Sequence, residues 1–434
     1  MSEPATRAPE LRDEPAKPRT LWRHGDFLRL WSAQAVSAFG SRITRIALPI
    51  IAVTTLGQTS AMLGVLAAMQ LVPGVILAMA AGGFVDRGRK RRILIGADLV
   101  RGVLVASLTL SWALGALTMA QVLIVGAGVG AASALFQITD VAYLPTLIDR
   151  RSLVEGNAKL ETTEALAEIT GPASAGVLIA ALGAPFAVAI DAVSYFWSAF
   201  MLGRIRTAER SVARPAVATP ARRGESFRVG MRAVFGHPLL RPIVIALMIW
   251  SLLGGFFMSL YTLYCLRDLQ LSEATFGVII AMGGVGSLAG AVLARTLSQS
   301  LGVGWTLILT SALSLACAAF IPLASIAPSH AVMIGFLAAH QVLSDCFAVS
   351  FIILSVTLRQ TVLPKELLGR ANAAVHVCTS GVLPIAALLA GVLAHGIGAR
   401  DALWIGVGVS LLAPISVWPL RKLKAMPVPA IEAP

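Results

Sequence analysis

The sequence predicts an all-α polytopic membrane protein whose twelve transmembrane helices form two pseudo-symmetric six-helix bundles. The 434 residues are 57% hydrophobic and only 13% charged, with a mean hydropathy of +0.80, whereas a soluble globular chain has about 25% charged residues. The apolar runs are continuous and long enough for a helix to cross roughly 30 Å of hydrocarbon. Helices are expected because no unpaired backbone group can face lipid, and the alternating polarity of barrel strands is missing.

The apolar runs divide six and six around a polar stretch. Residues 1–26 are polar and contain four prolines, which predicts a disordered cytoplasmic tail rather than a signal peptide. Residues 27–203 and 241–422 are expected to form the two bundles, and residues 423–434 a short C-terminal tail. Residues 204–240 predict a cytoplasmic linker whose second part has the apolar spacing of an interfacial helix. An unstructured linker is the alternative. The expected spans are 28–56, 61–84, 93–114, 118–147, 161–182, 185–203, 241–266, 274–296, 304–324, 331–358, 371–396 and 401–420.

The positions of lysine and arginine predict the orientation in the membrane. If both termini are cytoplasmic, only Arg267 and Arg400 fall in outer loops, and the other cations between the spans fall inside. Cytoplasmic loops carry an excess of Lys and Arg, so this bias favours cytoplasmic termini.

The densest block of charge joins the second and third expected spans. It reads Gly82-Gly83-Phe84-Val85-Asp86-Arg87-Gly88-Arg89-Lys90-Arg91-Arg92. The Asp86 carboxylate can pair with these cations or with the N-terminus of a neighbouring helix. One interpretation is a topology anchor alone. The other is a gating latch made of Gly82, Asp86, Arg87 and Arg91.

The two halves of the chain repeat the same order of motifs. Residues 146–158 align with residues 361–373, each joining the fourth span of its half to the fifth. Gly-Ala pairs at 183–184 and 398–399 then begin the last hairpin of each half. Two similar six-span units around a midplane site are typical of an alternating-access transporter.

Over nearly all of residues 25–422 the sequence resembles the major facilitator superfamily. The charged block resembles the superfamily's loop 2–3 signature, in an Asp-Arg-x-x-basic-basic form similar to the branch that holds the enterobactin exporter and macrolide-efflux proteins. Ile46-Ala47-Leu48-Pro49 and Asp191-Ala192-Val193-Ser194-Tyr195 fit the same branch. The fifth span resembles the antiporter signature of superfamily exporters, with Gly171, Pro172 and Gly176 matching. The arginine that many drug antiporters carry early in the fourth span is missing from 122–126, which counts against proton antiport.

The resemblance implies a proton-coupled exporter of bulky amphipathic molecules, of drug or siderophore type, in the bacterial cytoplasmic membrane. The expected partners are a small-molecule substrate, the proton and the lipid bilayer, and the expected state is a monomer. An importer of a polar solute and a lysophospholipid flippase stay open as alternatives. A membrane-embedded enzyme is disfavoured, because it would need His, Asp or Cys clustered at one depth.

Charged side chains within the spans are the first functional candidates, because each costs about 2.5–3.5 kcal/mol or more at mid-bilayer. Arg45 and Asp140 are expected to line the cavity and partly compensate one another, or else to form a structural buried pair. Asp345 with His340 is the second-half candidate for protonation, with a helix-packing contact as the alternative. The predicted substrate or proton pathway comprises Arg45, Asp140, Glu168, Tyr261, Tyr264, His340 and Asp345.

Other chemistries find no support in the sequence. The four cysteines lie singly and the six histidines are scattered, so neither a disulfide nor a metal site is expected. The glycine-rich runs lack a preceding strand and a following Gly-Lys-Ser/Thr, which argues against a nucleotide loop. No cofactor is expected. The net charge of +13 does not come from a basic folded domain, so nucleic-acid binding is not expected either.

Overall fold

The computed structural model describes residues 21–149, 152–207 and 220–425. Eleven described helices are long and apolar enough to cross a membrane, and α5 is the twelfth when its two bent segments count as one span. The predicted all-helical fold class is therefore confirmed.

The first-half helices are α1 (Gly25–Ile50) with its π-helical end η2 (Ile51–Thr55), α2 (Ser60–Arg87), α3 (Lys90–Ala113), α4 (Met119–Leu147), α5 (Leu153–Leu182) and α6 (Ala184–Gly203). The second half has α8 (Leu240–Leu263) with η4 (Tyr264–Asp268), α9 (Glu273–Ser300), α10 (Val303–Cys317) with α11 (Phe320–Leu323), α12 (His330–Val362), α13 (Lys365–Ile397), and α14 (Ala399–Ser410) with α15 (Leu412–Val417).

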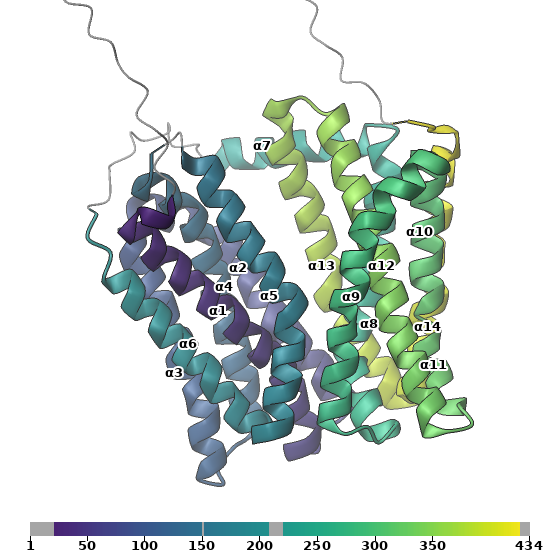
Figure 1. Cartoon of the computed structure of the whole chain (residues 1–434), viewed down its shortest axis with the longest axis horizontal. Helices are drawn as coiled ribbons and strands as arrows, with labels where there is room; N and C mark the ends of the chain where they lie inside the picture. Colours follow the sequence, from purple (N-terminus) through teal and green to yellow (C-terminus); the bar gives the residue numbers. More distant parts are fainter. Residues whose placement is uncertain (1–20, 150–151, 208–219, 426–434) are drawn as a thin grey trace, which may run out of the picture.

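The helices form two groups that diverge from one another. Figure 1 shows the ribbons of α1–α6 and of α8–α15 separating toward the end where α7 (Pro220–Phe235) lies, which we call the α7 end. Between the groups, α2 packs against α13 and α8, and α5 packs against α9. One hydrophobic core cluster contains residues of both groups, and two further clusters belong to one group each. The two groups are therefore joined through these contacts, while each also has a core of its own. We call the interface between the two groups the seam.

The N-terminal segment becomes ordered earlier than expected. Leu21 begins a short 3-10 helix, is buried, and donates its N–H to Glu155 Oε1 at 3.1 Å. The Asp26 carboxylate accepts the backbone N–H groups of Arg206 and Thr207 at 3.2 and 2.8 Å. Residues 21–26 of the expected disordered tail therefore include a 3-10 helix and the start of α1, with Leu21 and Asp26 buried against the first bundle. The predicted tails at residues 1–20 and 426–434, and the predicted linker at residues 208–219, lie outside the described residues.

Local sequence explains where most spans begin and end. Thr118, Ser272 and Ser329 cap α4, α9 and α12 by accepting backbone N–H groups at 3.1–3.3 Å, as expected for side-chain oxygens at a helix N-terminus. Gly183 and Gly398 end α5 and α13 with φ of 79° and 88° and pass directly into α6 and α14. The matched Gly-Ala pairs thus occupy the same corner of the two halves.

The first span of each half also ends in the same way. π-Helical turns η2 and η4 follow α1 and α8, and each leads into a residue with positive φ. In the first half that residue is Gly57, with φ of 60°, and in the second half it is Gln270, with φ of 55°. The backbone bonds Gln58 N–H to Ala52 O and Leu271 N–H to Cys265 O are also equivalent, at 2.9 and 3.0 Å. The repeat therefore extends to turns that no sequence motif marks.

Helix α5 bends by 43° between its segments Glu155–Glu168 and Thr170–Leu182. Pro172 lies inside this helix. A proline cannot donate to the carbonyl four residues earlier and its ring collides with that carbonyl, here that of Glu168. The bend of α5 therefore lies about one turn before the proline.

Candidate functional site

Four ionised side chains from α1 and α5 meet near the midpoints of these two spans, and we call them the charged cluster. It consists of Arg42, Arg45, Glu164 and Glu168. The Arg42 guanidinium forms ion pairs with both Glu164 and Glu168, and Arg45 lies 3.9 Å from Glu168. The cluster holds two positive and two negative groups at a depth where an uncompensated charge is costly. Glu168 is therefore the acid partner that the first-half arginines share.

The members of the charged cluster differ in exposure. The Arg42 side chain is 6% exposed, whereas those of Glu164, Glu168 and Arg45 are 56%, 60% and 55% exposed. Gly171 makes room for Arg42, since a methyl group at this glycine would lie 2.6 Å from Arg42 Cγ. A buried cation thus faces two acids whose side chains are more than half exposed.

Asp140 and Arg45 were expected to compensate one another, but each has a different partner. Gln34 of α1 donates its side-chain amide to Asp140 Oδ1. Arg45 instead approaches Glu168. Deeper in the first bundle, Asp98 and Arg101 form a fully buried ion pair on α3, with Arg101 between the rings of Phe136 and Tyr195 at 4.5 and 4.4 Å. Through Arg101 this pair connects α3 with aromatic side chains of α4 and α6.

The second-half candidates His340 and Asp345 both belong to α12 but have different neighbours. His340 Nδ1 lies 3.1 Å from the carbonyl of Cys317 on α10. Asp345 accepts the amide of Gln341 at 2.9 Å and lies against Gly283 of α9. The structure therefore points these two α12 side chains toward different helices.

The two tyrosines of the seventh span lie in the packed core. Tyr261 is 2% exposed and stacks on Phe257, with ring centroids 4.1 Å apart. Tyr264 is 1% exposed and donates its hydroxyl to the Pro322 carbonyl at 3.3 Å. In this conformation neither side chain is open to solvent.

The predicted latch is only partly described. Gly82, Asp86 and Arg87 belong to the last turns of α2, and their side-chain environments lie outside the described part of the chain. Arg91 donates from Nε to the Leu202 carbonyl at 2.7 Å and from Nη2 to the Gly203 carbonyl. These carbonyls end α6, where cations are favoured by the helix dipole. Arg91 therefore ties α3 to α6 within the first bundle.

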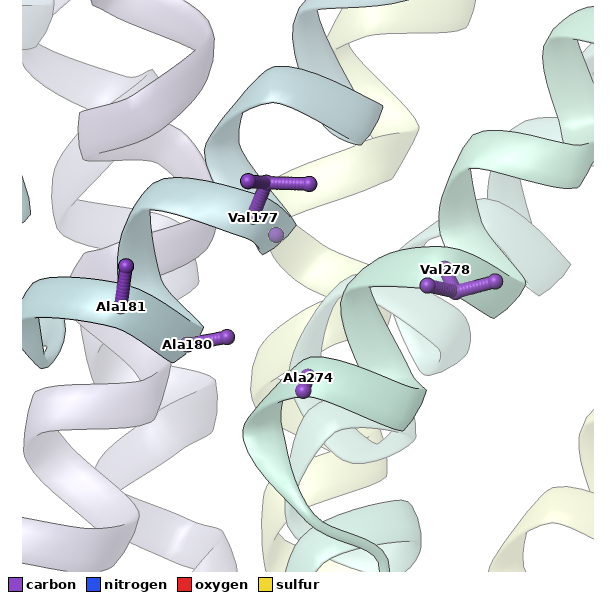
Figure 2. Close-up of a pocket in the computed structure, with 6 residues that line it drawn as sticks. Val177, Ala180, Ala181, Ala274 and Val278 are labelled. Atoms are coloured by element: carbon purple, nitrogen blue, oxygen red, sulfur yellow. The ribbon is translucent and has the colours of Figure 1, made fainter.

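The seam between α5 and α9 is built on small residues. A methyl group on Gly176 would collide with the Cα of Gly277, and the reverse is also true. Figure 2 shows a pocket at this crossing, to which Val177, Ala180 and Ala181 contribute from α5 and Ala274 and Val278 from α9. Val177 and Val278 are 63% and 56% exposed. This apolar crevice, about 310 Å³ in volume, is suited to packing and to lipid contact rather than to ionic chemistry.

A second pocket lies in the second bundle and was missed by the sequence analysis. It has a volume of about 400 Å³ and is lined by α8, α12 and α13, with Trp250 and Arg359 among its lining side chains. Trp250 Nε1 and Arg359 Nε are buried without a hydrogen-bond partner. In the sequence, Arg359 counts only as one of many cytoplasmic cations, and nothing there indicates that it faces a pocket.

Within the described residues, no group of three or more His, Cys, Asp or Glu side chains is placed to hold a metal ion.

Comparisons with known proteins agree with this architecture. A family model described as transmembrane secretion effector matches residues 18–432. The chain is 22% identical over 406 residues to the uncharacterized MFS-type transporter YvqJ of Bacillus subtilis (strain 168), covering 91% of this chain and 94% of the relative. A bacterial homologue of the iron transporter ferroportin, in an inward-facing state, superposes with a TM-score of 0.70 at 16% identity, covering 92% of this chain and 98% of its own. A bacterial homologue of the human lysosomal transporter Spinster gives 0.66 at 14% identity, covering 94% and 98%. At these identities the solved structures are evidence for the fold alone.

Proposed function

The chain belongs to the transmembrane secretion effector family of the major facilitator superfamily, and from this premise we propose that it is a proton-coupled exporter of bulky amphipathic molecules. As a member it is a multi-pass membrane transporter. Export, proton coupling and the class of substrate are the proposed part. The α7 end is proposed to face the cytoplasm, because the loops at that end carry most of the lysines and arginines.

The observation that carries the proposal is the charged cluster of α1 and α5. Arg42 is shared by Glu164 and Glu168, so the cluster has two acids for one buried cation. Protonation of Glu168 removes one of these negative charges, so that Arg42 keeps an ion pair with Glu164 alone. The proton therefore changes the force between α1 and α5, which is a requirement for coupling it to movement.

Helix α5 is placed to pass this change to the other bundle. Gly176 lies about two helical turns beyond Glu168 on α5, and it contacts Gly277 of α9. The bend of α5 falls between these two residues. A change at Glu168 thus acts on the same helix that forms the seam, and alternating access requires movement at this seam.

Transport by Glu168→Gln in proteoliposomes tests the proposal. The assay uses a panel of cationic, neutral and acidic amphiphiles, an imposed pH gradient and an internal pH dye. Wild-type protein is expected to accumulate at least one compound against its gradient, by about tenfold for one-to-one exchange across a one-unit pH gradient. The variant is expected to lose accumulation and proton flux while still equilibrating the compound.

Glu161→Gln is the matched control, because Glu161 is an exposed residue of α5 that forms none of the cluster's ion pairs. It should accumulate compound as wild type does. Coupling through Glu168 would be wrong if Glu168→Gln moved protons with the compound at the wild-type ratio. If wild-type protein moved no compound faster with a pH gradient than without one, proton-coupled export itself would fail.

A further inference from the structure

The pocket of α8, α12 and α13 holds two hydrogen-bond donors that lack partners. Trp250 Nε1 and Arg359 Nε are both buried, and neither has a hydrogen bond among the described residues. None of the ion pairs formed by described residues includes Arg359. Buried donors are normally satisfied, so unpaired donors lining one pocket call for an acceptor from outside the chain.

The hydroxyl groups of the pocket do not supply that acceptor in the present geometry. Ser251, Ser355 and Thr379 line the same pocket, and each donates to a backbone carbonyl of its own helix at 2.7–3.0 Å. Their lone pairs remain able to accept a hydrogen bond, whereas their hydrogens are already donated to the backbone. The pocket therefore offers a cation, an indole N–H and three hydroxyls, and none of its lining residues is acidic.

The rest of the lining is apolar and suits a hydrocarbon chain. Leu247, Val356 and Leu383 are among the lining side chains. A volume of about 400 Å³ lies in the range typical of small-molecule sites, which are mostly apolar with a few placed polar groups. The apolar wall and the unpaired cation together match a molecule with one acidic group on an apolar body.

The location fits entry from the α7 end. Helix α8 begins and helix α12 ends at that end, and Arg359 lies in the last turn of α12. Helices α8 and α13 also pack against α2 of the first bundle, so the pocket lies on the side of the second bundle that is turned toward the first. A basic residue at a helix C-terminus is favoured by the helix dipole alone. That explanation accounts for the charge of Arg359 but not for its unpaired Nε in a pocket that also holds an unpaired indole N–H.

We propose that this pocket binds the acidic group of an amphiphile, a carboxylate or phosphate on an apolar chain, through Arg359 and Trp250. The inference rests on the proposed function and narrows its substrate class to acidic amphiphiles. The same chemistry occurs in a transported compound and in the headgroup of an anionic phospholipid, so the test separates these two sources.

The test uses nanodiscs of zwitterionic phosphatidylcholine and energy transfer from tryptophan to a dansylated undecanoic acid or to its methyl ester. Wild-type protein is expected to bind the acid about tenfold to hundredfold more tightly than the ester, the range for a hydrogen bond to a charged group. Arg359→Gln should abolish this preference and Arg359→Lys should keep part of it. Arg295→Gln is the matched control, since Arg295 is an exposed residue of α9 outside the pocket. It should bind as wild type does.

Two results would overturn the inference: equal binding of acid and ester by wild-type protein, or an acid preference that persists in Arg359→Gln. The wild-type comparison needs no variant, so it holds even if a substitution impairs folding. Replacing part of the lipid with phosphatidylglycerol separates the sources. If phosphatidylglycerol displaces the dansylated acid and this displacement depends on Arg359, the site is assigned to a membrane lipid. If binding of the dansylated acid is undiminished, the site is assigned to a soluble amphiphile.

Failure of this inference and failure of the proposed function are distinguishable. Binding is measured without a gradient, so an acid site at Arg359 stands even if no compound is transported. Conversely, accumulation of cationic or neutral compounds with no acid preference would leave export intact and remove only this site.

Discussion

At the scale of single residues, the charged cluster is asymmetric in its contact with solvent. Arg42 is buried, whereas Glu164 and Glu168 are more than half exposed. Removing the acids would leave an unpaired buried cation, and removing the cation would leave acids that can be solvated. Breaking a buried pair by removing one partner costs about 3–5 kcal/mol, and an exposed pair contributes about 0–1 kcal/mol. The cost should therefore depend on which partner is removed.

We predict that Glu164→Gln together with Glu168→Gln destabilises the protein by about 3 kcal/mol, and that Arg42→Gln costs about 1 kcal/mol. Thermal unfolding of the purified protein in detergent measures both changes. A triple variant that carries all three substitutions should recover most of the loss of the double variant. Equal losses of stability in the double variant and in Arg42→Gln would show that Arg42 reaches solvent in the folded protein.

Sequence reasoning identified most of the charged residues but not their pairing. The depth of Arg45 and Glu168 follows from their positions along the spans. Their pairing depends on the rotation and adjacency of α1 and α5, which one sequence does not specify, and Arg45 was therefore assigned to Asp140. Arg359 was missed for a related reason. A cation near a helix end is already explained by topology, and only the packing of α8 against α12 and α13 places it in the same pocket as Trp250.

At the scale of elements, the duplicated turn after the first span of each half uses unequal residues. Gly57 and Gln270 both have positive φ, a conformation that costs a residue with a side chain about 1–2 kcal/mol. The Gln270 side chain donates an exposed hydrogen bond to the Arg267 carbonyl, which offsets part of this cost. The second half thus tolerates a strained residue where the first has glycine.

Gln270→Gly is predicted to stabilise the protein by about 0.5–1 kcal/mol, because glycine adopts positive φ without strain. The reciprocal change, Gly57→Gln, should destabilise it by about 1 kcal/mol. Both values can be measured as shifts in thermal unfolding relative to wild type. A loss of stability in Gln270→Gly would mean that the Arg267 hydrogen bond outweighs the backbone strain.

The elements were the most predictable part of the molecule. Twelve apolar runs predict the spans, and Pro172 accounts for the bend of α5, because length, composition and proline geometry act locally. The exact ends were less predictable. Asp26 accepts hydrogen bonds from the backbone of Arg206 and Thr207, which follow the end of α6, and a contact between such distant residues is not marked by the local sequence.

At the scale of the whole molecule, the two bundles meet through bare backbone where α5 crosses α9. Gly176 and Gly277 leave no room for a side chain on either helix. Small residues permit such close approach of helices in membranes. When one bundle moves relative to the other, the two helices must therefore either stay in contact at these glycines or separate there.

Gly176→Val and Gly277→Val are each predicted to abolish most transport and to destabilise the protein by about 1–3 kcal/mol, the usual cost of overpacking. Flux in proteoliposomes and thermal unfolding are the measurements. Gly96→Val and Gly408→Val serve as controls, since nothing lies within 4 Å of a methyl group at either position. Wild-type flux from Gly176→Val would show that the crossing is not needed for transport.

The unpaired donors belong to the second half and the acids of the charged cluster to the first, so our two proposals imply that substrate preference and energy coupling can diversify independently during evolution. Under these proposals, changes along α8, α12 or α13 alter which compound is accepted and leave the coupling by α1 and α5 unchanged. A chimaera that joins this protein's first six spans to the last six of a relative should consequently adopt the relative's cargo preference.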